Sequence, residues 1–148
     1  MNQSLAVILV CCVCLVPGAA AAQESPFLPE PAFLALCRSA HVMLDSLHWS
    51  GGNTTLEGLA FDVPVVTLPG PFMRGRHSHA MLDILGLAGE LSARDPGHYV
   101  EIAARLAHDP GFRSRMSAAI RERKHLLFDD AAPIRALEAF LREACGTA

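Results

Sequence analysis

A chain of 148 residues has the length of one domain, with enough material to bury a hydrophobic core. Its composition, 51% hydrophobic and 18% charged, is that of a globular protein. The formal net charge is −3, and the twelve Lys and Arg residues are scattered rather than clustered, which argues against nucleic acid as the main partner.

Residues 1–22 differ from the rest of the chain. An apolar run over residues 5–16 is followed by a series of alanines, the pattern of a secretory signal peptide with cleavage near Ala22. No basic residue precedes the run, and it is too short to span a bilayer as a helix, so no membrane span is predicted. A signal peptide and an artefactual start, attached to a domain that properly continues upstream, both stay open. Residues 23–31 carry three prolines and are predicted to link this segment to a domain over residues 32–148.

The domain is predicted to begin with a helix over residues 32–39 and a short strand over 41–44, which runs into Asp45. The loop that follows, residues 46–52, ends in two glycines. Glycine lets the backbone turn sharply and approach a ligand closely. This loop is therefore the first candidate for a binding site.

The next predicted element is a helix over residues 54–61, with Asn53 and Thr54 as its capping residues. The unpaired N–H groups and the dipole of a helix start can hold a phosphate at Gly52, Asn53 and Thr54 without a lysine. An ordinary capped turn stays open as the alternative, because the spacing fits neither the dinucleotide-binding glycine motif nor the P-loop. The expected buried stripe of this helix is Leu56, Leu59 and Ala60.

Further strands and helices alternate along the chain. A β-branched run at residues 63–68 predicts a buried parallel strand, a helix follows over 75–85, and a weak strand is predicted at 90–92. This alternation is typical of a Rossmann-like half-sheet of the α/β class. Ligands of such sheets bind beyond the carboxyl ends of the strands, where the loops at 46–54 and 69–76 are both expected.

The last third of the chain is predicted to be helical. One helix covers residues 96–108, a second begins after Asp109 at Pro110, and a final helix has Pro133 in its first turn. Their apolar stripes are expected to face the core. The stripe residues are Tyr99, Ala103, Leu106, Phe112, Met116, Ile120, Ile134, Leu137, Phe140 and Leu141.

Several separate segments together resemble one family. Over about three quarters of its length the chain resembles the C-terminal part of the catalytic region of O-GlcNAc transferase-like glycosyltransferases, the SPINDLY-type family usually preceded by tetratricopeptide repeats. The segments that carry the resemblance are residues 42–46, 51–57 and 63–70, Arg76, and Arg123 with residues 127–128.

The resemblance implies a GT-B fold, of which this chain would be the C-terminal, donor-binding Rossmann-like lobe with its C-terminal helices. The donor in the family is a UDP-sugar, usually UDP-N-acetylglucosamine, and the acceptor is a Ser or Thr hydroxyl of a protein. By position, the first residues of the glycine segment would face the diphosphate and Glu57 would accept hydrogen bonds from the ribose. The residues expected at the UDP-sugar site are Gly52, Asn53, Thr54, Glu57, His48 and Arg76.

This sequence departs from the family in some places. Asn53 stands where many members have Thr, Gly52 where animal members have His, and Glu57 where Asp is commoner. The N-terminal lobe and the repeats have no counterpart, so no catalytic residue is assigned. The chain alone is expected to bind the donor weakly and to transfer nothing, because half of the cleft is missing. Its expected partners are the UDP-sugar, the missing lobe or repeats, and a protein acceptor.

No cofactor or metal is expected. His41, His77 and His79 suggest a metal site, but side chains at i and i+2 on a helix diverge. The alternative function is a secreted, non-enzymatic binding or interaction domain that keeps the fold, in which Cys37 and Cys145 could form one disulfide. The resemblance implies a cytoplasmic protein, whereas a true signal peptide implies export.

Overall fold

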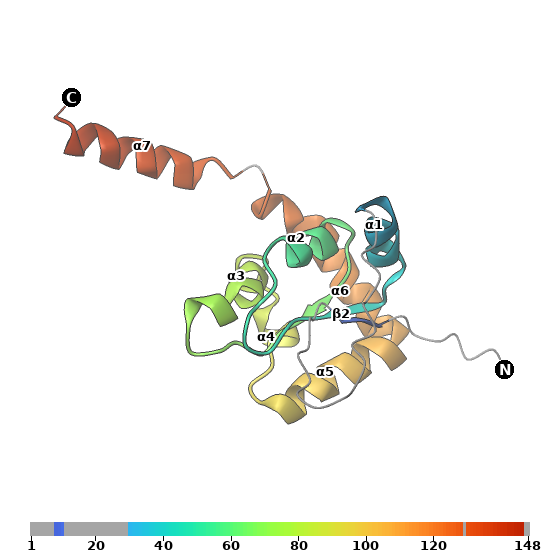
Figure 1. Ribbon diagram of the computed structural model, residues 1–148. Helices are drawn as coiled ribbons and strands as arrows, with labels where there is room; N and C mark the ends of the chain where they lie inside the picture. The colour runs from blue at the N-terminus through green and yellow to red at the C-terminus, as the bar shows by residue number, and fades with distance from the viewer. Residues whose placement is uncertain (1–7, 11–29, 129, 147–148) are drawn as a thin grey trace, which may run out of the picture.

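A small parallel sheet lies among the helices of this α/β protein (Figure 1). The computed structural model describes residues 8–10, 30–128 and 130–146. The three strands lie in the order β1 (Ile8–Val10), β2 (Val42–Leu44), β3 (Val65–Val66), and all pairs are parallel. Helix α2 lies on one side of the sheet and α5 on the other (Figure 1). The predicted α/β class is confirmed, although the protein is mostly helical.

The strand β3 lies inside the β-branched run predicted from the sequence, but its ladder is shorter than expected. Val63, Val65, Val66 and Thr67 are all buried, as a hydrophobic parallel strand requires. Pro64 has no N–H, and it takes part in the ladder through its carbonyl, which accepts a hydrogen bond from the Met43 N–H at 2.9 Å. Proline therefore stands at the start of the strand, where its missing donor costs nothing.

Seven helices and two short 3₁₀ turns make up most of the described part of the chain. Asp95 and Asp109 cap the two longest core helices by accepting hydrogen bonds from the backbone N–H groups of His98 and Phe112. The helices are α1 (Glu30–Ser39), α2 (Asn53–Ala60), α3 (His77–Ile84), α4 (Ala88–Leu91), α5 (Pro96–His108), α6 (Pro110–Arg123) and α7 (Ala132–Ala144), and the turns are η1 (Met73–Gly75) and η2 (Lys124–Leu126).

The hydrophobic core lies between the sheet and helices α1 to α6. The apolar periodicity of α5 and α6 correctly predicted Leu106, Phe112, Met116 and Ile120 as buried, but it missed Ile102 of α5, which is also buried. Cys37 is also buried, whereas Cys145 is exposed beyond the end of α7, and no disulfide joins the two.

Two predictions for the middle of the chain were wrong in detail. The weak strand at 90–92 is instead the short helix α4, and only Ser92 pairs with the sheet, through an isolated parallel bridge to Thr67. The helix predicted from residue 75 begins at His77, because a 3₁₀ turn occupies residues 73–75. The bridge still extends the sheet beyond β3, so the alternation of strand-like and helical segments is preserved.

Helix α7 extends away from the rest of the protein (Figure 1). The prediction that its apolar stripe faces the core was wrong, because these side chains are 50 to 64% exposed. Helical periodicity indicates an apolar face but not what covers it. The exposed residues are Ile134, Leu137, Phe140 and Leu141.

The N-terminal segment is described only in part. Residues 8–10, within the signal-peptide-like run, form β1 beside β2, and the proposed cleavage site near Ala22 lies outside the described residues. Of the linker predicted at 23–31, residues 30 and 31 already belong to α1. None of the helices that the structure describes has the length and apolar character needed to cross a membrane.

A charged turn after α2 links it to α6. Asp62 has a left-handed backbone with φ of 63°, and its carboxylate pairs with Arg121 and Lys124, each at 2.9 Å. Burial raises the pKa of Asp62, but hydrogen bonds and charges from Lys124 and Arg121 outweigh this and hold it below its ordinary 3.8. The ion pairs of Asp62 therefore stabilise the folded state fully at pH values above 3.8, and this stabilisation is lost as the pH falls through the lowered pKa of Asp62.

The variant Asp62→Asn is expected to be less stable than the wild type at pH 7, by a margin that shrinks as the pH falls toward 2. Asn tolerates a left-handed backbone, so the substitution removes mainly the charge. Urea midpoints at several pH values measure the margin, with the exposed Asp83→Asn on α3 as a matched control. A margin that does not change with pH would contradict the assigned role of the ion pairs.

Candidate functional site

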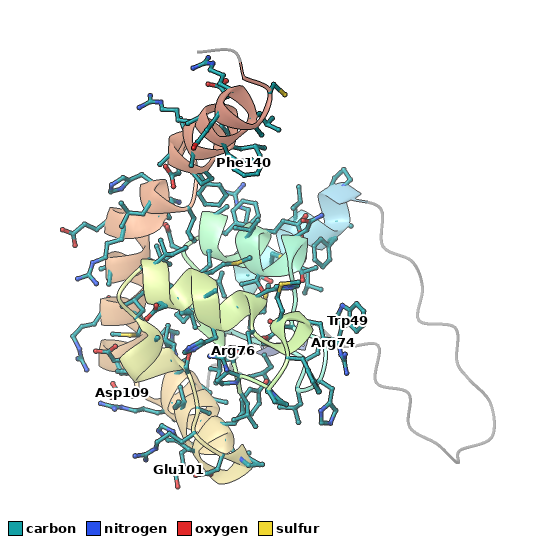
Figure 2. The ribbon with its side chains drawn as sticks, turned by 90° about the vertical axis from the view of Figure 1, so that its left-hand side faces the viewer. Trp49, Arg74, Arg76, Glu101, Asp109 and Phe140 are labelled. Atoms are coloured by element: carbon teal, nitrogen blue, oxygen red, sulfur yellow. The ribbon has the colours of Figure 1, made fainter. Side chains whose placement is uncertain are left out.

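Two loops meet at the carboxyl edge of the sheet, as the sequence predicted. The first, residues 46–52, follows β2, and the second, residues 69–76, follows the strand β3. The Ser50 N–H donates to the Arg74 carbonyl at 2.8 Å, and the Ser78 hydroxyl, just after the second loop, reaches the Gly51 carbonyl at 3.3 Å. Figure 2 shows Trp49 and Arg74, one from each loop, at this edge. These contacts fix the glycine segment against α3.

A buried carboxylate holds the first loop in place. Asp45 directly follows β2 and is 5% exposed. One carboxylate oxygen accepts hydrogen bonds from the Ser50 hydroxyl at 2.8 Å and the Thr67 hydroxyl at 2.6 Å, and the other accepts from the Gly51 N–H at 2.7 Å. The Asp45 carbonyl also accepts a hydrogen bond from the Tyr99 hydroxyl of α5 at 2.8 Å. Asp45 thus ties the loop to both β3 and α5.

Three buried hydroxyls extend this network to the helices. The Ser50 hydroxyl accepts a hydrogen bond from the Ser78 N–H at the start of α3, and the hydroxyls of Ser50 and Ser78 lie 2.9 Å apart. The Thr55 hydroxyl of α2 lies 2.8 Å from that of Ser78. Because buried polar groups need partners, a fully bonded set of this kind favours one loop conformation over its alternatives.

The start of α2 has no side-chain cap. Gly52 occupies the N-cap position with φ of −97° and ψ of −88°, and the prediction that Asn53 and Thr54 cap the helix was wrong, because both lie inside it. The first N–H groups of a helix have no partner within the helix. Gly52 also leaves its surroundings open, since a Cβ atom placed there meets nothing within 4 Å. This helix start can receive an anion at its N–H groups.

The remaining candidate residues lie around this helix start. Glu57 is half-buried, one helical turn after Asn53. His48 is exposed on the first loop, and its carbonyl oxygen approaches Gly75 of the second. Arg76 is exposed and donates a hydrogen bond from Nη1 to the Gly70 carbonyl at 3.0 Å, so it braces the second loop. Asn53, Thr54 and Glu57 thus share one helix with Gly52 as its N-cap, whereas His48 and Arg76 lie on the flanking loops.

The hydrogen-bond network that supports the site was not predicted from the sequence. The network consists of Asp45, Ser50, Thr55, Thr67 and Ser78. One signal was available: a carboxylate directly after a buried parallel strand lies where ligand sites form. The hydroxyls carried no such signal, because Ser and Thr are common in loops and at helix starts. In the described residues, no group of three or more His, Cys, Asp or Glu side chains is arranged to hold a metal ion.

Comparisons with known proteins relate the chain to one family. No family model matches the chain. It is 35% identical over 81 residues to the SPINDLY protein of Petunia hybrida and 34% identical over 103 residues to that of Solanum lycopersicum, covering 55% and 68% of this chain. Both carry the name probable UDP-N-acetylglucosamine–peptide N-acetylglucosaminyltransferase. A solved O-GlcNAc transferase variant from Thermobaculum terrenum superimposes with a TM-score of 0.68 at 36% identity, over 78% of this chain.

The resemblance to SPINDLY-type O-GlcNAc transferases is confirmed. The chain is therefore a glycosyltransferase-like domain. It spans 9% and 11% of the length of these two SPINDLY relatives, and 22% of the solved O-GlcNAc transferase. The comparisons with SPINDLY-type enzymes do not favour the alternative of a non-enzymatic secreted module.

Proposed function

We propose that this chain is the donor-binding, C-terminal lobe of a GT-B glycosyltransferase and binds the diphosphate of a UDP-sugar at Gly52, Asn53 and Thr54. The observation that carries the proposal is the uncapped start of α2, which follows a glycine with open space around it. A helix start of this kind presents N–H donors and positive potential to an anion. The similarity to O-GlcNAc transferases over 78% of the chain supports a nucleotide-sugar as that anion.

The flanking residues complete this site. Glu57, one turn along α2, accepts hydrogen bonds from the ribose hydroxyls of the donor, while its carboxylate stays clear of the diphosphate at the helix start. His48 and Arg76 border the diphosphate from the two loops. The N–H groups and Arg76 supply the stabilisation of the departing UDP, so the proposal includes no metal and no cofactor.

Transfer needs more than this lobe. The acceptor hydroxyl must be held in line with the sugar, and the cleft must close on both sides of the donor. We assign these tasks to a second lobe that approaches the edge formed by the two loops, and the acceptor to a Ser or Thr hydroxyl of a protein. The chain alone therefore binds the donor weakly and does not catalyse transfer.

The test is the response of the full chain to UDP. In the wild type, millimolar UDP is expected to raise the melting temperature and to shift the amide signals of residues 50–58. In Glu57→Ala, the loss of charge-assisted hydrogen bonds to the ribose is expected to weaken binding roughly tenfold to a hundredfold. Glu101→Ala, an exposed position on α5 far from the loops (Figure 2), serves as the matched control.

Two results would contradict the proposal. In the first, UDP leaves the amide signals of residues 50–58 unchanged in the wild type. In the second, Glu57→Ala and Glu101→Ala bind UDP with the same affinity as the wild type, which would remove Glu57 from the site.

A further inference from the structure

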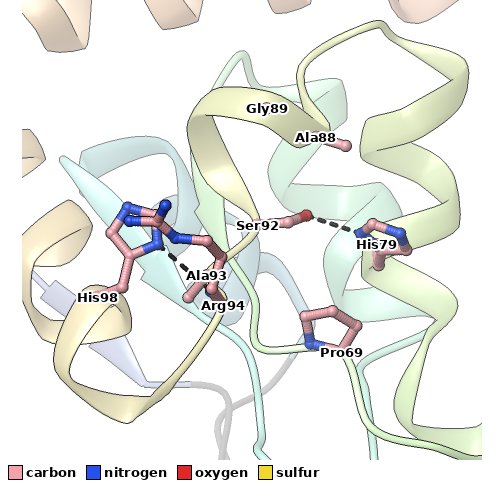
Figure 3. A pocket seen from close by; sticks show the side chains of 8 residues that line it. All are labelled: Pro69, His79, Ala88, Gly89, Ser92, Ala93, Arg94 and His98. Carbon is pink, nitrogen blue, oxygen red and sulfur yellow. Dashed lines mark hydrogen bonds between the residues drawn. The ribbon is translucent and has the colours of Figure 1, made fainter.

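A polar cavity lies beside the first turn of α3. It has a volume of about 620 Å³ and is bounded by the loop after β3, by α3 and α4, and by the start of α5 (Figure 3). Its lining residues are Pro69, His79, Ala88, Gly89, Ser92, Ala93, Arg94 and His98. The cavity lies beyond the bridge between Thr67 and Ser92, at the carboxyl edge of the sheet where ligand sites of α/β proteins form.

The first turn of α3 separates this cavity from the proposed donor site. Ser78 is buried and bonds to Ser50 of the glycine loop, whereas the next residue, His79, bonds through Nδ1 to the Ser92 hydroxyl at 2.9 Å. Successive residues of a helix point about 100° apart, so the two side chains leave this turn in different directions. The cavity is thus a separate feature, and the inference drawn from it does not rest on the UDP proposal.

The polar groups of the cavity are suited to an anion. No ion pair among the described residues involves the exposed Arg94, and no acidic residue lines the cavity. His98 accepts a hydrogen bond at Nδ1 from the Arg94 N–H at 3.3 Å, so neutral His98 carries its proton on Nε2 and can donate it. Figure 3 shows Arg94 and His98 on one wall and His79 with Ser92 on another.

We propose that this cavity binds a small molecule that carries a phosphate or carboxylate group, with Arg94 as its anchor. A guanidinium presents a planar pair of donors that matches either group, and the Nε2–H of His98 adds a third. The volume is within the range of small-molecule sites and far exceeds that of an inorganic ion. Pro69, Ala88 and Ala93 supply apolar surface for the body of the ligand.

The test uses inorganic phosphate as the probe on the full chain, at constant ionic strength. Phosphate is expected to shift the amide signals of residues 88–94 in the wild type, and Arg94→Gln is expected to bind it roughly tenfold more weakly. His98→Asn keeps an acceptor for the Arg94 N–H but lacks the Nε2–H donor of His98. Its affinity for phosphate is therefore expected to fall about threefold. Arg135→Gln, an exposed position on α7, is the control that keeps wild-type affinity.

A parallel titration with UDP separates this cavity from the donor site. Phosphate-induced shifts of residues 88–94 that disappear in Arg94→Gln, while any shifts of residues 50–58 remain, support an independent cavity, whether or not UDP binds elsewhere. Three results would overturn the proposal: wild-type phosphate affinity in Arg94→Gln, phosphate shifts confined to residues 50–58, or UDP-induced shifts of residues 88–94 that disappear in Glu57→Ala. The last result would assign the cavity to the nucleotide.

Discussion

Asp45→Ala is expected to lower the free energy of unfolding by about 3 kcal/mol or more. The substitution removes the acceptor for three donors, the buried hydroxyls of Ser50 and Thr67 and the part-buried N–H of Gly51. Each buried donor left without a partner costs roughly 1–3 kcal/mol, although neighbouring hydroxyls can rotate to recover part of this. Urea unfolding at pH 7 measures the loss.

Two further variants show whether the loss comes from the hydrogen bonds. Asp45→Asn keeps one carbonyl oxygen as an acceptor, so it is expected to be intermediate between the wild type and Asp45→Ala. Asp83→Ala, at an exposed position of α3, is expected to change stability by less than about 0.5 kcal/mol. If Asp45→Ala is no less stable than Asp83→Ala, the network does not contribute as described.

Asp45→Ala also tests whether the hydrogen-bond network positions the proposed donor site. Without the Asp45 carboxylate, the loop loses the side-chain bonds to Thr67, just after β3, and to the Gly51 N–H. The amide signals of residues 50–58 are therefore expected to shift and broaden while those of α6 stay in place. A change confined to the loop would show that Asp45 positions the start of α2. Equal changes throughout the protein would show a general structural role only.

The hydrophobic framework could be predicted from the sequence because its signal is local. The β-branched run around Val65 has a strand's composition, and α5 and α6 repeat apolar residues at helical spacing after an Asp-Pro start. Leu106 and Ile120, both fully buried, lie where this spacing placed them. The meeting of the two loops also followed from the sequence, because parallel strands bring their carboxyl ends to one edge.

The inward face of α2 could not be predicted in the same way. Apolar spacing indicated Leu56, Leu59 and Ala60, but the buried residues are Thr55, Gly58 and Leu59. Thr55 is buried because its hydroxyl forms a hydrogen bond with that of Ser78, 23 residues later in the chain. Gly58 is buried because the Met43 side chain packs against its Cα. Such pairings arise from tertiary contacts, which hydrophobic periodicity does not encode.

Helix α7 shows the opposite limit. Its sequence gives a clear apolar stripe, yet Leu137 and Phe140 are 58% and 64% exposed. Apolar periodicity indicates that one face of a helix is hydrophobic, but it does not indicate which surface packs against that face. The sequence therefore predicted the helix and its polarity correctly but not its surroundings.

Gly51→Ala and Gly52→Ala are expected to differ sharply, although the two glycines are adjacent. A Cβ atom at Gly51 would lie 2.8 Å from the hydroxyl oxygens of both Thr54 and Thr55, and 3.4 Å from the carboxylate of Asp45. Threonine side chains are stiff at χ1, and the Thr55 hydroxyl is held by Ser78, so neither can move away cheaply. We expect Gly51→Ala to lose about 1–3 kcal/mol of stability by overpacking.

At Gly52 a Cβ atom meets nothing within 4 Å, and the φ of −97° suits any residue, so Gly52→Ala is expected to keep the stability of the wild type within about 0.5 kcal/mol. Its methyl group would instead narrow the approach to the N–H groups of α2, which predicts weaker UDP binding on an intact fold. Urea unfolding and UDP titration of both variants separate the two roles. Equal stability of the two variants would contradict the close packing assigned to Gly51, and unchanged UDP affinity in Gly52→Ala would show that the ligand does not approach the backbone there.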